Sequence, residues 1–228
     1  MGRGQNGVWT GTRFHATEKP SFMFPMRFVN STSVGVFLRF CIRRRFAPHV
    51  SSLKTMAIYT DGACSNNGST KNTPRGGYAF VWNEDPSGNH SAALENKGPD
   101  GQVHPHTSNR AELRAVIEAL KFRSWWGEGW ERIVITTDSE YVGKGATEWL
   151  RSWAGRDWRT SGGKPVANQD LWRTLSDILG DYAQSGCEIS FWTVPRQFNT
   201  LADVAAKAAA ERADGRDEYS NIAGVLIS

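Results

Sequence analysis

Cysteine is scarce in this chain of 228 residues, which has only Cys41, Cys64 and Cys187. They form no Cys-x-x-Cys pair, and their number is odd, which disfavours both a disulfide framework and a cysteine metal site. Long apolar runs are missing too. The best, residues 34–38, is interrupted by Arg39 and is far shorter than the ~20 residues of a membrane span. We therefore expect reduced thiols in an intracellular protein without a membrane segment.

Acidic residues are nearly absent from residues 1–55, which hold nine Lys or Arg but only Glu18. The rest of the chain holds eighteen basic and twenty-two acidic residues, so the overall charge of +4 comes from this first segment. Such a composition is typical of a mitochondrial transit peptide. The alternative is a disordered extension in front of a domain that starts at Met56, and in either case we expect residues 1–55 to be removable.

The pattern of apolar residues and turn residues predicts one domain over residues 56–214, with a loosely ordered tail at 215–228. Strands are expected at 57–60, 77–82, near 91–94, 133–135 and 187–193, and helices from Ser108 to the glycines at 127 and 129, from about 139, over 168–183 and over 200–213. Strands that first form hairpins and then alternate with helices predict an α/β fold, a mixed five-stranded sheet with helices on both faces.

Four acidic residues stand out because each lies at the end of a strand or near the start of a helix. They occur as Thr-Asp-Gly-Ala at Asp61, Ser-Asn-Arg-Ala-Glu at Glu112, Thr-Thr-Asp-Ser-Glu at Asp138 and Asn-Thr-Leu-Ala-Asp at Asp203. A single acid at such a place is usually a helix cap or a surface charge. Four that folding can bring together repel one another unless a cation compensates them, and carboxylate oxygens suit Mg²⁺ or Mn²⁺. The sequence therefore predicts a metal site.

These segments, together with a Trp- and Arg-rich stretch at 149–172, resemble type 1 ribonuclease H, the endonuclease that cuts RNA paired to DNA. The resemblance covers residues 56–214 and implies the ribonuclease H-like fold with sheet order 3-2-1-4-5 and a basic handle. It implies that Asp61, Glu112, Asp138 and Asp203 hold two Mg²⁺ ions, with Mn²⁺ as a substitute. Hydrolysis would leave 5′-phosphate and 3′-hydroxyl ends.

The resemblance also implies contacts with an RNA–DNA hybrid, the expected partner. Phosphates and sugars position such a substrate without reading its sequence. Trp149 and Trp172 are expected to pack in the core, whereas Trp153 and Trp158 are expected to frame a groove. The full set of expected contact residues is Asn67, Ser108, Asn109, Trp153, Trp158, Arg159, Thr160 and Lys164.

One departure from the family pattern concerns a histidine that many members carry between the last strand and the last helix. Here that loop, residues 194–199, contains Arg196 and no histidine. Arginine stays protonated near neutral pH and can replace a histidine only electrostatically. We expect slower turnover, not inactivity.

Two alternatives stay open at this stage, a catalytically weak or degenerate hybrid-binding protein, and a nuclease of the same fold with another substrate. We expect a eukaryotic monomer in the mitochondrion or the nucleus, with no protein partner inferable.

Overall fold

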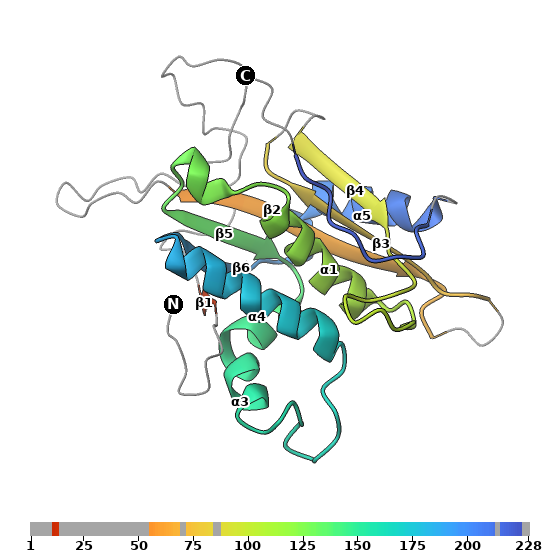
Figure 1. The fold of residues 1–228 in the computed structure, drawn as a ribbon. Helices are drawn as coiled ribbons and strands as arrows, with labels where there is room; N and C mark the ends of the chain where they lie inside the picture. Colours follow the sequence, from red (N-terminus) through yellow and green to blue (C-terminus); the bar gives the residue numbers. More distant parts are fainter. Residues whose placement is uncertain (1–10, 14–54, 69–71, 84–87, 213–214, 225–228) are drawn as a thin grey trace.

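The structure is a computed structural model, and it describes residues 11–13, 55–68, 72–83, 88–212 and 215–224 (Figure 1). A single sheet runs through these residues. Its strands are β1 (Thr12–Arg13), β2 (Thr55–Ser65), β3 (Arg75–Val81), β4 (Asn89–Ala93), β5 (Arg132–Thr137) and β6 (Glu188–Thr193).

The sheet has the order β1-β6-β5-β2-β3-β4. The pairs β2–β3 and β3–β4 are antiparallel. The pairs β2–β5, β5–β6 and β6–β1 are parallel. The predicted order 3-2-1-4-5 is confirmed for β4-β3-β2-β5-β6. The prediction of five strands was one short, because Thr12–Arg13 add an edge strand too brief to leave a period-two pattern.

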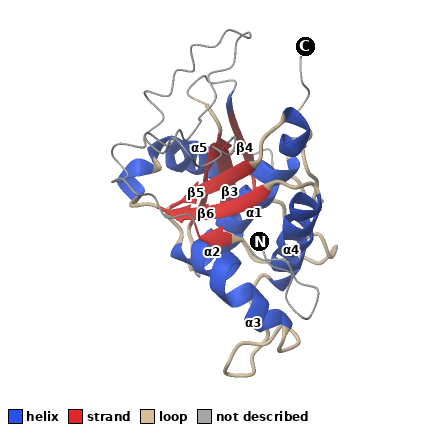
Figure 2. Ribbon diagram, turned by 90° about the vertical axis from the view of Figure 1, so that its left-hand side faces the viewer, coloured by secondary structure: helices blue, strands red, loops and turns tan. Residues whose placement is uncertain are grey.

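The helices α1 (Ser108–Lys121), α2 (Glu140–Lys144), α3 (Leu150–Ala154), α4 (Gln169–Gln184) and α5 (Thr200–Glu211) cover both faces of the sheet. α1 and α4 lie on one face, and α5 lies on the opposite face (Figure 2). A π-helical turn, Gly145–Trp149, joins α2 directly to α3. The mixed α/β class is therefore confirmed.

Alternating residues of β2 divide the core between the two faces. Met56 and Ile58 belong to the large core cluster that includes apolar residues of α1 and α4, whereas Ala57 and Tyr59 pack with Ala202 of α5. Successive side chains of a strand point to opposite faces. By the same alternation, residue 61 belongs to the α5 face and residue 62 to the α1 face.

Several predicted boundaries were wrong. Thr107, not Ser108, is the N-cap of α1, because its side chain accepts a hydrogen bond from the Arg110 backbone N–H. α1 ends at Lys121, and the glycines at 127 and 129 belong to a following 3₁₀ turn. Gly129 closes that turn with φ of 81°, a conformation that favours glycine.

The described part of the C-terminal tail, residues 215–224, is hydrogen-bonded to the domain, contrary to the prediction of a loose tail. The Asn96 and Lys97 amides donate to carbonyls of residues 216 and 217, at 3.2 and 2.9 Å. The Gly224 amide donates to the Phe122 carbonyl at 2.7 Å. These backbone contacts depend on tertiary structure and leave little trace in the sequence.

Cys64 and Cys187 are free thiols, and Cys41 lies outside the described residues. Within the described ranges, no helix combines the length and apolar character that crossing a membrane requires.

Candidate metal centre and nucleic-acid interface

The sheet register brings two of the four predicted acids side by side. β2 and β5 are parallel, and Tyr59 is the register partner of Thr136. Continuing that register by two residues places Asp61 level with Asp138, which follows directly after β5. Both positions fall on the α5 side of the sheet by strand alternation. Asp138 was predicted from a strand end, and the topology makes it the neighbour of Asp61.

Glu112 reaches the same place because α1 packs very tightly against β2. A Cβ atom built on Gly62 would lie 2.0 Å from the backbone nitrogen of Glu112, so only glycine permits this approach. Glu112 is the fifth residue of α1, because the helix starts at Ser108. It therefore lies just past the first turn. Gly62 thus sets the position of the glutamate beside Asp61.

The electrostatics show that these carboxylates lie within each other's field. Burial, together with repulsion from Asp138, Asp203 and Glu112, raises the pKa of Asp61 from 3.8 to about 7. Burial likewise raises the pKa of Glu112 from 4.5 to about 7, although the Ser139 hydroxyl opposes the rise. Like charges that crowd together in this way favour a bound cation.

Asp203 behaves differently because two side-chain cations hold it. Burial alone would raise its pKa, but Lys207 and Arg196 lower it overall. Lys207 Nζ lies 2.7 Å from one carboxylate oxygen, and Arg196 Nη2 lies 2.5 Å from the other. Arg196 Nε also approaches Asp138 Oδ2 at 3.8 Å. The predicted electrostatic role of Arg196 at this loop therefore has a matching geometry.

Two further residues organise the carboxylates and were not predicted as site residues. The Asn199 amide donates to Asp138 Oδ1 at 2.8 Å and to the Thr60 carbonyl at 2.9 Å. The Ser139 hydroxyl donates to Glu112 Oε2 at 2.5 Å and also accepts from the Val142 amide as the N-cap of α2. Asn199 begins the motif that ends in Asp203, which was the available sequence signal. Ser139 resembled an ordinary cap.

The residues fit a divalent cation. Asp61 is only 3% exposed, and its Oδ2 atom is buried without a hydrogen-bond partner. A buried carboxylate oxygen that lacks a donor is costly. A metal ion would supply the missing positive partner, and the hard oxygen donors match Mg²⁺ or Mn²⁺.

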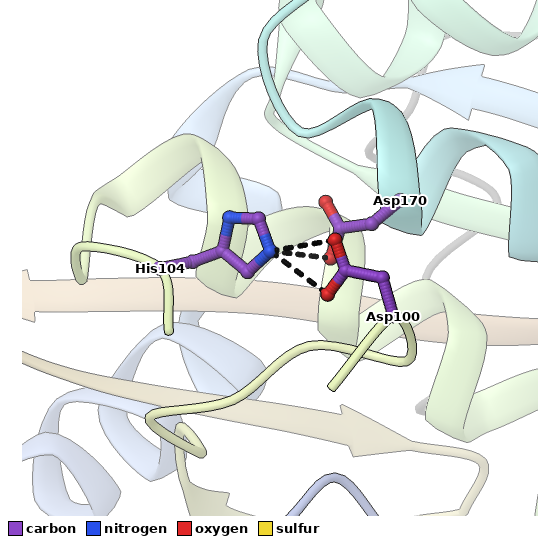
Figure 3. Close-up of side chains that lie close together, drawn as sticks. All are labelled: Asp100, His104 and Asp170. Carbon is purple, nitrogen blue, oxygen red and sulfur yellow. Dashed lines mark hydrogen bonds and ion pairs between the residues drawn. The ribbon is translucent and has the colours of Figure 1, made fainter. Parts of the chain in front are cut away.

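A second group of possible metal ligands, Asp100, His104 and Asp170, lies elsewhere (Figure 3). His104 Nε2 is 3.0 Å from Asp100 Oδ1 and 3.6 Å from Asp170 Oδ2. Asp170 is already paired with Arg110, whose two terminal nitrogens donate to it at 3.0 and 2.7 Å. Because Arg110 neutralises Asp170, we interpret this group as an ion-pair cluster that joins the start of α1 to the start of α4.

The two histidines nearest to the Glu112 helix in sequence are engaged away from the carboxylates. His104 belongs to the ion-pair cluster just described, and His106 Nδ1 accepts a hydrogen bond from the Gly76 amide at 2.9 Å. Neither contact replaces the histidine that residues 194–199 lack.

The predicted handle is a folded loop on an aromatic base. Trp172 is fully buried, and Trp153 packs against it with ring centroids 5.3 Å apart. Trp158 is half-buried with Arg173 above its ring at 5.1 Å. The prediction that Trp172 is a core residue is confirmed, and Trp153 also belongs to this cluster. The prediction that Trp149 is a core residue was wrong, because Trp149 is only half-buried, with its ring tilted against Trp153 at a centroid distance of 5.6 Å.

The polar residues of the handle lie at its outer end. Arg159 and Lys164 are exposed, and Arg159 donates to the Gly163 carbonyl at 3.0 Å. The Thr160 hydroxyl donates to the Lys164 carbonyl at 3.2 Å. Contacts inside the loop therefore fix the backbone that carries Arg159 and Lys164.

Asn67, Ser108 and Asn109 form a separate group at the start of α1. Asn67 Nδ2 lies 3.4 Å from the Ser108 hydroxyl, although the two residues come from different elements. Asn67 and Asn109 are exposed and Ser108 is half-buried. This group therefore has free surface beside the helix that carries Glu112.

The fold and the carboxylate site define a nuclease-like α/β domain, and the sequence comparisons identify its family. The profile of the RNase H family matches residues 53–211. The chain is 36% identical over 163 residues to a ribonuclease H of Treponema pallidum, covering 69% of this chain and 92% of the relative. It is 34% identical over 171 residues to a ribonuclease H of Paracidovorax citrulli, covering 72% and 99%.

The chain therefore belongs to the ribonuclease H family, whose members generally use a divalent metal ion. Both relatives are bacterial, and the type 1 subclass and the eukaryotic origin stay predictions. Among solved structures, the ribonuclease H domain of prototype foamy virus matches with a TM-score of 0.51 and 21% identity, over 68% of this chain and 93% of that domain. At this identity the likeness shows the fold alone.

Proposed function

We propose that the chain is a type 1 ribonuclease H that hydrolyses the RNA strand of RNA–DNA hybrids and leaves 5′-phosphate and 3′-hydroxyl ends. The observation that carries the proposal is the convergence of Asp61, Glu112 and Asp138, with one Asp61 oxygen buried and unpartnered. Two relatives that this chain matches over most of their own length are ribonucleases H. A foamy virus protease-reverse transcriptase of the same fold was solved with an RNA/DNA hybrid.

Each carboxylate has a proposed role in holding two Mg²⁺ or Mn²⁺ ions. Asp61, whose pKa is raised by each of the other three acids, would help to hold both ions. Glu112 and Asp138 would complete the ligands of one ion, and Asp203 would hold the other. When bound, such a pair of ions activates the attacking water and stabilises the departing oxygen of a phosphodiester.

The chain's own residues fix the orientation of these ligands. Asn199 holds Oδ1 of Asp138, whose Oδ2 lies 3.8 Å from Arg196 Nε, and Ser139 holds Oε2 of Glu112. Ligands held by such outer hydrogen bonds are positioned before the metal arrives. Arg196 and Lys207 keep Asp203 ionised until then.

Substrate contacts would come from two surfaces. Asn67, Ser108 and Asn109 lie beside the Glu112 helix, where 2′-hydroxyl contacts would distinguish RNA from DNA. Trp153, Trp158, Arg159, Thr160 and Lys164 of the handle would position the DNA strand through its phosphates. Because Arg159 and Lys164 would neutralise phosphates, hybrid affinity should fall as the salt concentration rises.

The second candidate is a hybrid-binding protein with weak or no catalysis. The specific observation in its favour is that Arg196, not a proton-accepting histidine, occupies the loop beside Asp203. We propose a monomer in the mitochondrion or the nucleus for either function.

One cleavage experiment separates these candidates. An end-labelled RNA strand is annealed to DNA, annealed to RNA or left single, and incubated with the protein in Mg²⁺, Mn²⁺ or EDTA. The control variant, Asp138→Asn, has nearly the same shape but loses the charge that a metal requires. Metal-dependent cleavage confined to the hybrid and lost in the variant supports the nuclease. Tight hybrid binding without cleavage in either metal supports the binding protein, and cleavage of RNA–RNA contradicts both.

A further inference from the structure

Residues 11–13 lie between the sheet edge and the base of the handle. Thr12 and Arg13 pair with Ser190 and Phe191 of β6. The Gly11 amide donates instead to the Ala146 carbonyl in the π-helical turn, at 3.1 Å. One short segment therefore contacts both the last strand and the turn that leads into α3.

The first residue of this segment has no room for a side chain. Gly11 is buried, and a Cβ atom built on it would lie 2.3 Å from the Phe191 ring. Real Cβ contacts are essentially never that short, so any other residue must shift the segment or the ring. Glycine is needed here for close approach, not for an unusual backbone angle.

The polar contacts reach the same two elements. The Thr12 hydroxyl lies 2.7 Å from Glu188 Oε1 and 2.8 Å from Ser190 Oγ, both on β6. Arg13 pairs with Glu148 of the π-helical turn. β1 also covers the edge of β6, which would otherwise be open to pairing with other chains.

The π-helical turn is the support of the handle. Gly145 of that turn packs against the buried Trp172 ring, because a Cβ there would lie 2.2 Å from it. The ring of Trp149, the last residue of the turn, is tilted against that of Trp153, whose carbonyl accepts a hydrogen bond from the Trp158 amide at 2.8 Å. A chain of packed contacts thus runs from residues 11–13 to the handle.

We infer that residues 11–13 are a positioning element of the nuclease, which fixes the handle relative to the sheet and thereby strengthens hybrid binding. The inference rests on the proposed function for its effect on binding, but not for its effect on structure. It also revises the expectation that residues 1–55 can all be removed, because this part of the segment fills a site in the domain. The partners of Gly11, Thr12 and Arg13 in the described residues lie on β6 and the π-helical turn and do not include Asp61, Glu112, Asp138 or Asp203. We therefore expect an effect on binding and not on the chemical step.

The test variant is Gly11→Ala in the full-length chain, and Gly127→Ala is its matched control. A Cβ at Gly127 meets only the Ser124 side chain, at 3.8 Å, so the same substitution is tolerated there. Thr12→Val is a milder second variant that keeps the shape of the segment but removes its hydroxyl contacts with β6. If Gly11→Ala does not fold, Thr12→Val decides the question.

The first readout is amide hydrogen exchange in EDTA, which needs no activity. We expect faster exchange in residues 145–154 and in β6 for both variants, with the larger effect in Gly11→Ala, and no change in α5 or in the control. Unchanged exchange in residues 145–154 and in β6 would overturn the inference. Faster exchange in α5 as well would indicate general loosening and would also overturn it.

The second readout separates binding from chemistry. We expect the KM for a hybrid to rise about three- to tenfold in Gly11→Ala, while kcat stays within about twofold. An equal fall in kcat would contradict a positioning role in binding. If the wild-type chain cuts no hybrid, the proposed function fails, yet the exchange experiment still decides whether residues 11–13 hold the handle.

Discussion

Helix α1 contacts two groups of buried charges that are built in opposite ways. In the first group, Arg114 donates to Glu95 at 2.7 Å, to Glu118 at 2.7 Å and to the Ser220 carbonyl at 2.6 Å. Glu118 accepts in addition from the Ile222 amide at 2.8 Å. The three side chains are at most 3% exposed, and their charged groups are paired.

The second group begins two residues before Arg114 on the same helix, at Glu112. Here the acids Asp61, Glu112 and Asp138 outnumber the cations, and an oxygen of Asp61 has no partner. Burial and mutual repulsion raise the pKa of Asp61 to about 7. The paired group joins α1 to β4's end and to the C-terminal tail, whereas the unpaired group costs stability and has a use only when a cation binds. Buried charge is therefore structural where it is paired and functional where it is not.

The largest loss of stability should follow from removing the cation of the paired group, Arg114. Arg114→Leu leaves Glu95 and Glu118 buried without their cation, and loss of one partner of such a group costs about 3–5 kcal/mol. Urea unfolding at pH 7 measures this loss. Glu118→Gln, which keeps a hydrogen-bonding side chain, should lose less and should retain kcat/KM per folded molecule. A variant of Arg114 as stable as wild type would refute the comparison.

At the carboxylate site, removing a charge should increase the stability of the fold. Asp61→Asn removes a charge that lacks a partner, so the metal-free protein should become more stable at pH 8, by about 2 kcal/mol, while cleavage is lost. The wild-type aspartate has a folded pKa of about 7 against 3.8 unfolded, so its stabilising protonation is lost as the pH rises through 7. Unfolding in EDTA should therefore show a gain that shrinks between pH 8 and pH 4. A gain independent of pH would contradict this explanation.

Metal binding should depend on pH for the same reason. Asp61 and Glu112 have pKa values of about 7 in the metal-free protein, and a cation must displace their protons. We expect the apparent affinity for Mg²⁺ to rise about tenfold from pH 6 to pH 7.5, with release of protons. Calorimetry in two buffers of different ionisation enthalpy measures both. Binding without proton release would show that these two residues are not ligands.

The smallest effect concerns the cations at Asp203. Arg196 is an exposed side chain that occupies one oxygen of a proposed ligand, so Arg196→Ala should bind Mg²⁺ about threefold more tightly. Lys121→Ala, which removes a cation paired with Asp181 instead, is the control. Weaker metal binding in Arg196→Ala would mean that the guanidinium assists the site.

The sequence determined the parts of this protein that local pattern encodes. Strand and helix periodicity predicted the elements of a mixed α/β sheet, because side chains alternate along a strand and recur every three to four residues along a helix. The order of the five strands was implied by the resemblance to type 1 ribonuclease H. The acids at strand ends and near a helix start predicted which residues meet, since parallel strands end at one edge of the sheet. The sequence also placed Trp172 in the core.

The tertiary structure decided what depends on contacts between distant segments. Strand β1 exists because Gly11 fits against Phe191, and the tail is ordered because Arg114 and Glu118 bind its backbone. Neither contact has a period or a motif. The tertiary structure also decided that Arg114 has ion-pair partners and that one Asp61 oxygen has none. Pairing depends on which side chains the fold brings within hydrogen-bond distance.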